Sequence, residues 1–423
     1  MGARRGEDPT LGTTTVNIVR LVCALSVATD HSLAHGRGRR TASRSTRAML
    51  AATSALPARA QAPARAAAPM SKQSGRGTRL PTGNHPRHPS GWMPAAGRNR
   101  GSATTTSAAP ARAADFPAPA EGFGIVITGG TKGVGYAMAR EFLARGDRVC
   151  ICGRSQIRVD NAVKALRFEF PGRCVAGAAC DVTDPRDVDD FGDFAASTVG
   201  TIHHWLNNAG MVSARETLLD VEPSEVVRVC NTNLTGAVLC CQKAAKIMVR
   251  QRAPKTSSSA SKNASVPFHV YNFGFSTWGA SFSKSTCTHK ATKRGLSQLT
   301  TSLVEELASA NVETVGVHQL SPGMVLTDLL LEGAEPVAKR FFNVLAEEPE
   351  TVAKDLVPKI RNTFTKTSAV EFLTLPDAVF RVVFGVPQIL NGGKFFDGDG
   401  VRVAREGELY KPNGVRLLYE EMK

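Results

Sequence analysis

Three glycines that follow an apolar stretch could bind a phosphate group. The residues from Ile125 to Thr128 predict a buried strand, and Gly129, Gly133 and Gly135 follow in a TGxxxGxG spacing. Apolar residues at helical spacing come next, so the glycines lie between a strand and a helix. Backbone N–H groups at the start of a helix favour an anion, and this context is the one that a dinucleotide-binding turn requires. The alternative is a purely structural turn.

Two cations lie where such a site would hold the adenine ribose. Arg154 follows the second predicted strand, 149–152, and Lys132 lies inside the glycine turn. A site for NAD usually offers an acid at the end of this strand, and this chain offers none. Two cations without an acid indicate a 2′-phosphate and therefore NADPH. The alternative for Arg154 is an ordinary solvated surface charge.

Strands and helices alternate from residue 122 onwards, with short polar connections. This order is typical of an α/β fold with a doubly wound (Rossmann) parallel sheet, covered by helices on both faces, in a single domain. The later strands are predicted to end near residue 180 and to span 202–206, 268–273 and 313–320. The main helices are predicted at 159–168, 224–250 and 289–308.

Polar residues follow several of these strands, at the edge where doubly wound sheets bind ligands. Asp181 follows the third strand, where it could accept a hydrogen bond from an adenine amino group. Asn208, Ala209 and Gly210 follow the fourth strand, where a small side chain lets the backbone approach the ribose. These positions support the same dinucleotide site.

The pattern changes after Thr327, where apolar residues at helical spacing predict helices rather than more sheet. An insertion directly after the sixth strand lies where a substrate lid would lie. We therefore expect a reductase core at 121–328, and a helical substrate-side extension with the C-terminal tail of the same domain at 329–423. The residues 395–397 are a further candidate strand.

Together these motifs resemble the short-chain dehydrogenase/reductase family over about 200 residues. The resemblance implies that Asn233 in NTNLTG holds a proton-relay water, that Ser276 binds the substrate carbonyl, and that Lys293 binds the ribose. The cofactor contacts predicted from the residues and the resemblance are Gly129, Thr131, Lys132, Gly133, Val134, Gly135, Arg154, Asp181, Val182, Asn208, Ala209, Gly210, Lys293, Pro322, Gly323 and Val325.

A finer resemblance is to the chlorophyll b reductases, through ITGGTKGVGYAMAREFLARGDRV, LSPGMVLTDLLLEG, FFNVLAEEPETVAKDLVPKIR and KFFDGDGVRVAREGELY. That family reduces the 7-formyl group of chlorophyll b to hydroxymethyl with NADPH, in the chloroplast stroma or peripherally at the thylakoid membrane. The resemblance implies chlorophyll b or a related tetrapyrrole as substrate. It leaves open a homo-oligomer, a partner reductase and association with a light-harvesting complex.

One residue departs from the family pattern. The family acid is a Tyr four residues before the Lys, so that both share a helix face, and here that position is His289, in HKATK. None of the chain's tyrosines occupies this place, and Trp278 stands where the chlorophyll b reductases carry a serine. Ser276 keeps the general family distance of thirteen residues before His289.

His289 leaves three functional hypotheses open. In a working reductase it donates the proton or hydrogen-bonds the carbonyl oxygen, although the charge of Lys293 disfavours the imidazolium. In the second hypothesis the chain is a catalytically weak subunit that binds NADPH and pigment for a partner reductase. The third is a reductase of another apolar carbonyl.

Composition limits the remaining classes. The chain has 423 residues and a net charge of +15, but residues 1–120 hold 17 Lys and Arg against four acids, so the charge belongs to this arm. The arm is rich in Ala, Arg, Ser and Pro, which predicts a transit peptide or disordered arm and no nucleic-acid site. The nine cysteines form no CxxC pair and no metal-ligand spacing with histidine, so we expect no metal site.

Overall fold

Parallel strands in the order β3-β2-β1-β4-β5-β6-β9 form the central sheet. The computed structural model describes residues 122–252 and 266–403 except 214 and 284, together with residues 409–411, 414 and 416. The strands are β1 (Gly124–Ile127), β2 (Arg148–Gly153), β3 (Val175–Ala179), β4 (His204–Asn207), β5 (Phe268–Phe273), β6 (Val315–Ser321) and β9 (Ala369–Glu371). The order reverses between β1 and β4, which confirms the predicted doubly wound fold.

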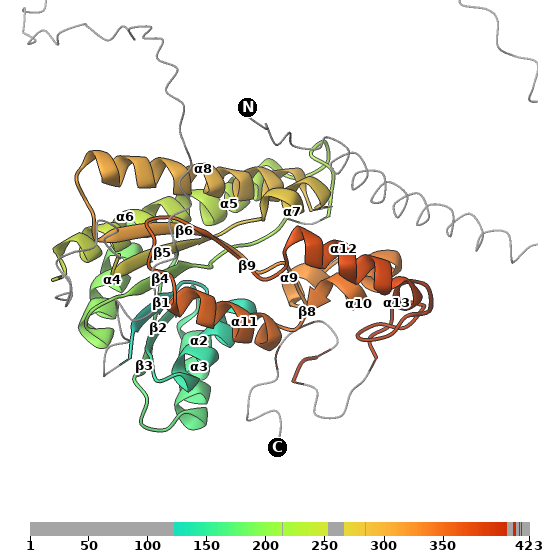
Figure 1. Cartoon of the computed structure of the whole chain (residues 1–423), viewed down its shortest axis with the longest axis horizontal. Coiled ribbons are helices and arrows are strands. Elements are labelled where there is room, and N and C mark those ends of the chain that lie inside the picture. The colour runs from blue at the N-terminus through green and yellow to red at the C-terminus, as the bar shows by residue number, and fades with distance from the viewer. Residues whose placement is uncertain are drawn as a thin grey trace, which may run out of the picture. The chain divides into compact units, whose positions relative to one another are not determined.

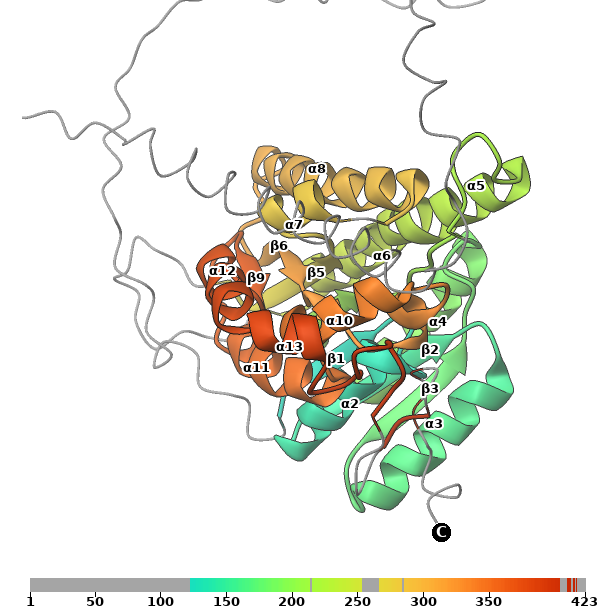
Figure 2. The same cartoon turned by 90° about the vertical axis from the view of Figure 1, so that its right-hand side faces the viewer.

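Helices cover both faces of this sheet (Figures 1 and 2). They are α2 (Gly133–Ala144), α3 (Gln156–Glu169), α4 (Pro185–Val199), α5 (Pro223–Cys230), the π-helical turn η1 (Asn231–Thr235), α6 (Gly236–Arg250), α7 (Thr277–Phe282) and α8 (Cys287–Ser309). Helices α2 and α3 share a hydrophobic core with one face, while α4, α6 and α8 share a core with the other. Every residue of β1 and β5 is buried, as expected for strands covered on both sides.

The chain after β6 forms β7 (Met324–Val325), α9 (Asp328–Leu331), α10 (Pro336–Leu345), β8 (Ala346–Glu347), α11 (Pro349–Arg361), α12 (Leu375–Phe384) and α13 (Val386–Asn391). Strands β7 and β8 pair with each other. Figure 1 shows α9, α10, α12 and α13 grouped beyond the ends of β6 and β9. This group lies within the extension predicted at 329–423, and its place at the substrate side remains a prediction.

Two parts of the C-terminal prediction are wrong. Strand β9 pairs parallel with β6, and α11 packs on α2 in the main core, so the chain after Thr327 contributes sheet as well as helices. The residues 395–397 form isolated antiparallel bridges rather than a strand of the sheet.

The predicted arm at 1–120 and the polar insertion at 253–265 lie outside the described residues. No helix in the described part of the chain could cross a membrane.

Histidines gather on the sheet beneath α11. His204 stacks on His269 with ring centroids 5.3 Å apart, and His269 Nδ1 lies 2.9 Å from His318 Nε2. These three and His203 are at most 6% exposed. Burial lowers the pKa of His203 to about 4 and of His269 to about 3, and it places those of His204 and His318 well below the usual range. No described cluster of His, Cys, Asp or Glu could hold a metal ion.

These histidines predict acid lability. As the pH falls below about 6.5 the unfolded histidines bind protons that the folded ones do not, so the free energy of unfolding decreases. Between about pH 6.5 and its folded pKa, each buried histidine lowers the free energy of unfolding by about 1.4 kcal/mol per pH unit. Urea unfolding measured at a series of pH values from about 8 to about 5 checks this slope.

Two variants separate titration from packing. Neither ring nitrogen of His204 has a hydrogen-bond partner in the described structure, so His204→Leu should keep its stability near pH 8 and lose one histidine's share of the acid slope. His318 bonds to His269 and to Ser368 Oγ, so His318→Leu should also be less stable near pH 8. An unchanged acid slope in His204→Leu would contradict the assignment.

Candidate active site

The glycine turn between β1 and α2 brings backbone N–H groups to the carboxyl edge of the sheet. Gly129 and Gly133 have φ of +65° and +57°, which side chains rarely adopt. A Cβ on Gly135 would lie 2.5 Å from Asn208 Nδ2 and 2.6 Å from Gly129 O. Helix α2 starts at Gly133, and no side chain caps its first turn. The turn therefore presents backbone donors of the kind that bind a pyrophosphate.

Asn208 fastens the glycine turn to the end of β4. Its Nδ2 donates to the carbonyl oxygens of Thr128 and Gly129, both at 3.0 Å, and the N–H of Ala209 donates to Thr128 Oγ1 at 3.0 Å. Next to it, a Cβ on Gly210 would lie 3.3 Å from Asn233 Oδ1 and 3.6 Å from Lys293 Nζ. Gly210 thus adjoins both catalytic candidates, while Asn208 holds the turn in shape.

The two predicted phosphate cations are in different states. Arg154 is exposed at the end of β2 and has no hydrogen bond or ion pair with any described residue. Lys132 forms an ion pair with Asp328, the first residue of α9. Asp328 therefore competes with a phosphate for the Lys132 ammonium, whereas Arg154 has no such competitor among the described residues.

The remaining cofactor candidates line the same edge. Asp181 Oδ1 accepts from the N–H and the hydroxyl of Thr183, at 3.0 and 2.8 Å, which fixes its carboxylate after β3. Thr131 lies against Gly153, and Val182 lies against Gly236. Val134 is half-buried and packs against the core that α2 shares. Pro322 is half-buried, Gly323 is exposed with φ of +70°, and Val325 is buried in β7.

Lys293 and His289 lie one turn apart on α8. Lys293 Nζ donates to the carbonyl oxygen of Phe273, at the end of β5, at 2.7 Å, and burial lowers its pKa to about 8. His289 is 8% exposed, with Nδ1 2.7 Å from Ser285 Oγ and its ring edge-to-face with Phe275. Burial, and then the charge of Lys293, lower the pKa of His289 to about 4. The imidazole is therefore neutral near pH 7, and Lys293 is the charged group.

Asn233 lies in the π-helical turn η1, between α5 and α6. Its Oδ1 accepts from the N–H of Met211 at 2.8 Å, and its Nδ2 donates to Met211 O at 2.8 Å and to Thr292 Oγ1 at 3.2 Å. Its amide thus joins the segment after β4 to α8. The predicted contact of Asn233 with a relay water remains a prediction.

Ser276 begins α7 and is 4% exposed. Its Oγ accepts from the N–H of Gly279 at 3.1 Å, and its own N–H donates to Ser321 Oγ at 3.1 Å. Because Oγ accepts here, its hydroxyl proton remains available to a ligand oxygen. The structure thus brings an available hydroxyl to the end of β5, the strand whose last residue also anchors Lys293.

A family model described as short chain dehydrogenase matches residues 124–336. This segment holds the glycine turn, Asn233, Ser276 and Lys293, and it covers half of the chain. The chain belongs to the short-chain dehydrogenase family. The match confirms the family prediction that the sequence motifs gave.

Among its relatives, a probable chlorophyll(ide) b reductase of Arabidopsis thaliana, named as chloroplastic, is 37% identical over 291 residues, 65% of this chain and 55% of that protein. A second chloroplastic chlorophyll(ide) b reductase of Arabidopsis thaliana is 40% identical over 258 residues, 60% of this chain and 70% of that protein. The chain thus spans about half the length of the first relative. A solved 3-ketoacyl-(acyl-carrier-protein) reductase from Brucella melitensis is 23% identical, with a TM-score of 0.49, over 60% of this chain and 97% of that one.

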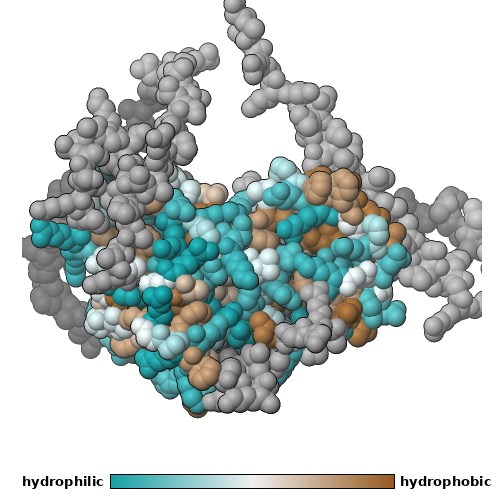
Figure 3. Space-filling view, turned by 60° about the horizontal axis from the view of Figure 1, so that its bottom comes forward, coloured by the Kyte–Doolittle hydropathy of each residue, from teal (hydrophilic) through white to brown (hydrophobic). Residues whose placement is uncertain are grey.

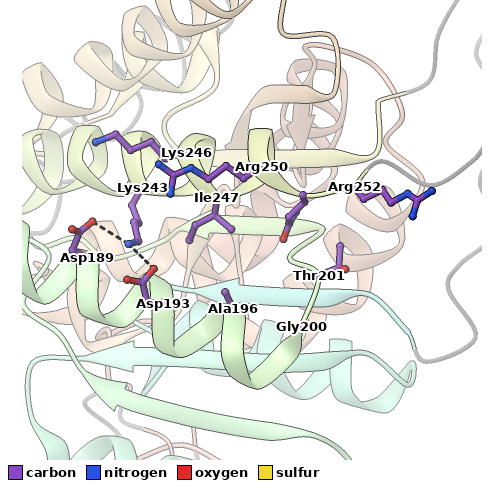
Figure 4. A pocket seen from close by; sticks show the side chains of 11 residues that line it. Asp189, Asp193, Ala196, Gly200, Thr201, Lys243, Lys246, Ile247, Arg250 and Arg252 are labelled. Atoms are coloured by element: carbon purple, nitrogen blue, oxygen red, sulfur yellow. Dashed lines mark ion pairs between the residues drawn. The ribbon is translucent and has the colours of Figure 1, made fainter.

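Figure 4 shows a cavity that is separate from the predicted site residues at the carboxyl edge of the sheet. That cavity of about 680 Å³ lies between α4 and α6 and includes Gly200 and Thr201, which precede β4. Lys243 bridges Asp189 and Asp193 there, with Nζ–Oδ1 distances of 3.0 and 2.7 Å. The cavity therefore lies at the opposite edge of the sheet and contains none of the predicted site residues.

Sequence reasoning missed Ser285 and Asp328, which contact predicted site residues. Ser285 lies four residues before His289, and this spacing at a helix start could have been recognised. Asp328 lies a few residues after the end of β6. Its contact with Lys132 joins two residues that are 196 positions apart in the sequence. No sequence pattern predicts that pair.

Asn233 should be important for stability as well as for the site. Asn233→Ala removes the bond to Thr292 and both bonds to the half-buried Met211, whose N–H and C=O lose their partner, so the free energy of unfolding should fall by about 2–4 kcal/mol. Thr292→Val removes the longer 3.2 Å bond from Asn233 and the bond that Thr292 Oγ1 donates to His289 O at 2.8 Å, but it leaves both bonds to Met211 and should cost less. Urea unfolding near neutral pH measures both, and equal losses in the two variants would contradict the role assigned to Asn233.

Proposed function

We propose that the chain is an NADPH-dependent reductase that converts the 7-formyl group of chlorophyll b to hydroxymethyl. The observation that carries this proposal is the 37–40% identity to chlorophyll(ide) b reductases over 258–291 residues. The site supports it, because an anion-binding turn, an available hydroxyl and a buried cation lie at one edge of the sheet. The exposed cation at Arg154 favours the 2′-phosphate of NADPH.

The residues present fit this cofactor. A side chain on Gly129 or Gly135 would occupy the space between the glycine turn and the end of β4, where a Cβ would lie 2.9 Å from Ala209 Cα or 2.5 Å from Asn208 Nδ2. The turn would hold the pyrophosphate, Arg154 the 2′-phosphate and Lys293 the nicotinamide ribose. When bound, NADPH supplies a hydride to the formyl carbon.

The chain's own residues must stabilise the oxygen on which negative charge develops. Ser276 donates its hydroxyl proton to that oxygen, and Lys293 keeps a positive charge beside it. His289 hydrogen-bonds the same oxygen as a neutral N–H donor rather than as an imidazolium, because its pKa is about 4. Lys293, with a pKa of about 8, is protonated near pH 7 and can therefore supply, through a water near η1, the proton that the neutral imidazole cannot.

The same pKa supports a second candidate, the catalytically weak subunit that binds NADPH and pigment for a partner reductase. A neutral imidazole is a weak proton donor, and losing a general acid typically costs about 10²–10⁴-fold in rate. The two candidates share the cofactor and pigment sites. They differ only in what His289 contributes to turnover.

The relatives named as chloroplastic support a place in the chloroplast, in the stroma or peripherally at the thylakoid membrane. Apolar side chains on α12 and α13 are 43–69% exposed, namely Phe380, Val383, Phe384, Val386 and Leu390. Figure 3 shows one face of the molecule, on which hydrophobic patches lie between larger hydrophilic areas. A peripheral contact through α12 and α13 would bring the substrate side towards an apolar pigment source. A homo-oligomer and a contact with a light-harvesting complex remain part of the proposal.

Replacing His289 by Tyr distinguishes the two candidates. If His289 is the adapted donor, His289→Tyr should lower kcat for chlorophyll b by about tenfold or more, because the phenol cannot keep the geometry set by Ser285 and Phe275. NADPH oxidation, followed together with formation of 7-hydroxymethyl chlorophyll a, measures this rate.

NADPH binding to both proteins serves as the control for folding. A rise in kcat by orders of magnitude in His289→Tyr would mean that the native chain lacks an effective acid, which supports the weak-subunit candidate. Absence of product from both proteins, with NADPH bound, would reject chlorophyll b as the substrate.

A further inference from the structure

The segment before α8 holds the imidazole of His289 in place. Ser285 Oγ lies 2.7 Å from His289 Nδ1, and the N–H of Ser285 donates to Ser283 Oγ at 3.2 Å. Phe275 packs against the same ring, with centroids 5.4 Å apart in an edge-to-face arrangement. Ser285 is half-buried, so water competes little for this bond.

The partners of Ser285 indicate which group donates in this contact. Its length of 2.7 Å allows either the Ser285 hydroxyl or the ring N–H to donate. Ser285 Oγ has no other partner among the described residues, so accepting from Nδ1–H would leave its own proton unpaired. We therefore take Nδ1 as the acceptor.

An acceptor at Nδ1 decides where the ring proton lies. A neutral imidazole carries one proton, so it must be on Nε2 when Nδ1 accepts. No described residue bonds to Nε2, which makes it the nitrogen that is left for a ligand. The opposite tautomer would present a lone pair to the substrate oxygen and repel it.

We propose that Ser285 is a positioning residue that fixes His289 in the tautomer with its proton on Nε2, so that the neutral ring donates a hydrogen bond to the substrate's carbonyl oxygen. The assignment rests on the proposed reductase function for its catalytic meaning. The tautomer itself does not depend on the substrate. In this chain, Ser285 and His289 together would replace the single tyrosine hydroxyl of the family.

The tautomer can be read by ¹⁵N NMR of the full chain labelled at histidine, near pH 7.5, with His289→Tyr used to identify the resonances of His289. We expect a protonated Nε2 and an unprotonated Nδ1 in the unaltered protein. Ser285→Ala should give a mixture of tautomers, and Ser285→Thr, which keeps the hydroxyl, should restore the single form. A proton on Nδ1 in the unaltered protein would overturn the proposal without any variant.

Kinetics give a second readout. Ser285→Ala should lower kcat for chlorophyll b about tenfold with little change in KM, and Ser285→Thr should recover most of the rate. Ser309→Ala, an exposed serine on the same helix, should change neither readout. A changed tautomer with an unchanged kcat would overturn the positioning role. Absence of turnover in all proteins, with the expected tautomer, would reject the proposed function but keep the assignment of the proton.

Discussion

The side-chain amide of Asn208 is the contact on which the site depends most. By donating to the carbonyl oxygens of Thr128 and Gly129, it fixes the glycine turn against the end of β4. The same packing forbids a side chain on Gly135 and leaves the first N–H groups of α2 for an anion. Because β1 and β4 are neighbours where the sheet order reverses, the turn and the segment up to Gly210 meet at one edge.

From that edge a continuous set of hydrogen bonds leads to the proposed chemistry. Asn233 ties Met211, just after β4, to Thr292 on α8, and Lys293 on the same helix is anchored to the end of β5. Burial of the His289 ring, and then the charge of the ammonium one turn away, lower the pKa of His289, so the imidazole remains neutral. In the proposed reductase, His289 would therefore act as a hydrogen-bond donor, and the proton would come from another group.

Much of the fold could be predicted from local patterns. The β1 to α2 unit, the strands and main helices that follow it up to β6, and the positions of Lys293 and Ser276 follow from apolar periodicity and motif spacing. Strand β9 could not, because Ala369–Glu371 is short and becomes a strand only by pairing with β6. The residues 395–397 have strand-like composition, but Asn343 on α10 bonds to their backbone and only isolated bridges form there.

The same distinction holds within the site. From the sequence, the charge of Lys293 predicted that His289 would disfavour the imidazolium form. The structure adds burial as the larger cause of the lowered His289 pKa. Lys132 was predicted as a phosphate ligand from its place in the turn, but its ion pair with Asp328 arises only when the start of α9 folds beside the glycine turn. Contacts within one helix turn were accessible to sequence reasoning, and contacts across the sheet edge were not.

The proposed reaction transfers a hydride to the formyl carbon of chlorophyll b. Its most direct test uses the full chain with NADPH carrying deuterium at the transferable position of nicotinamide C4, followed by mass spectrometry of the pigment. We expect one deuterium in the new hydroxymethyl group of the product. Unlabelled product, or no product while NADPH binds, would contradict it.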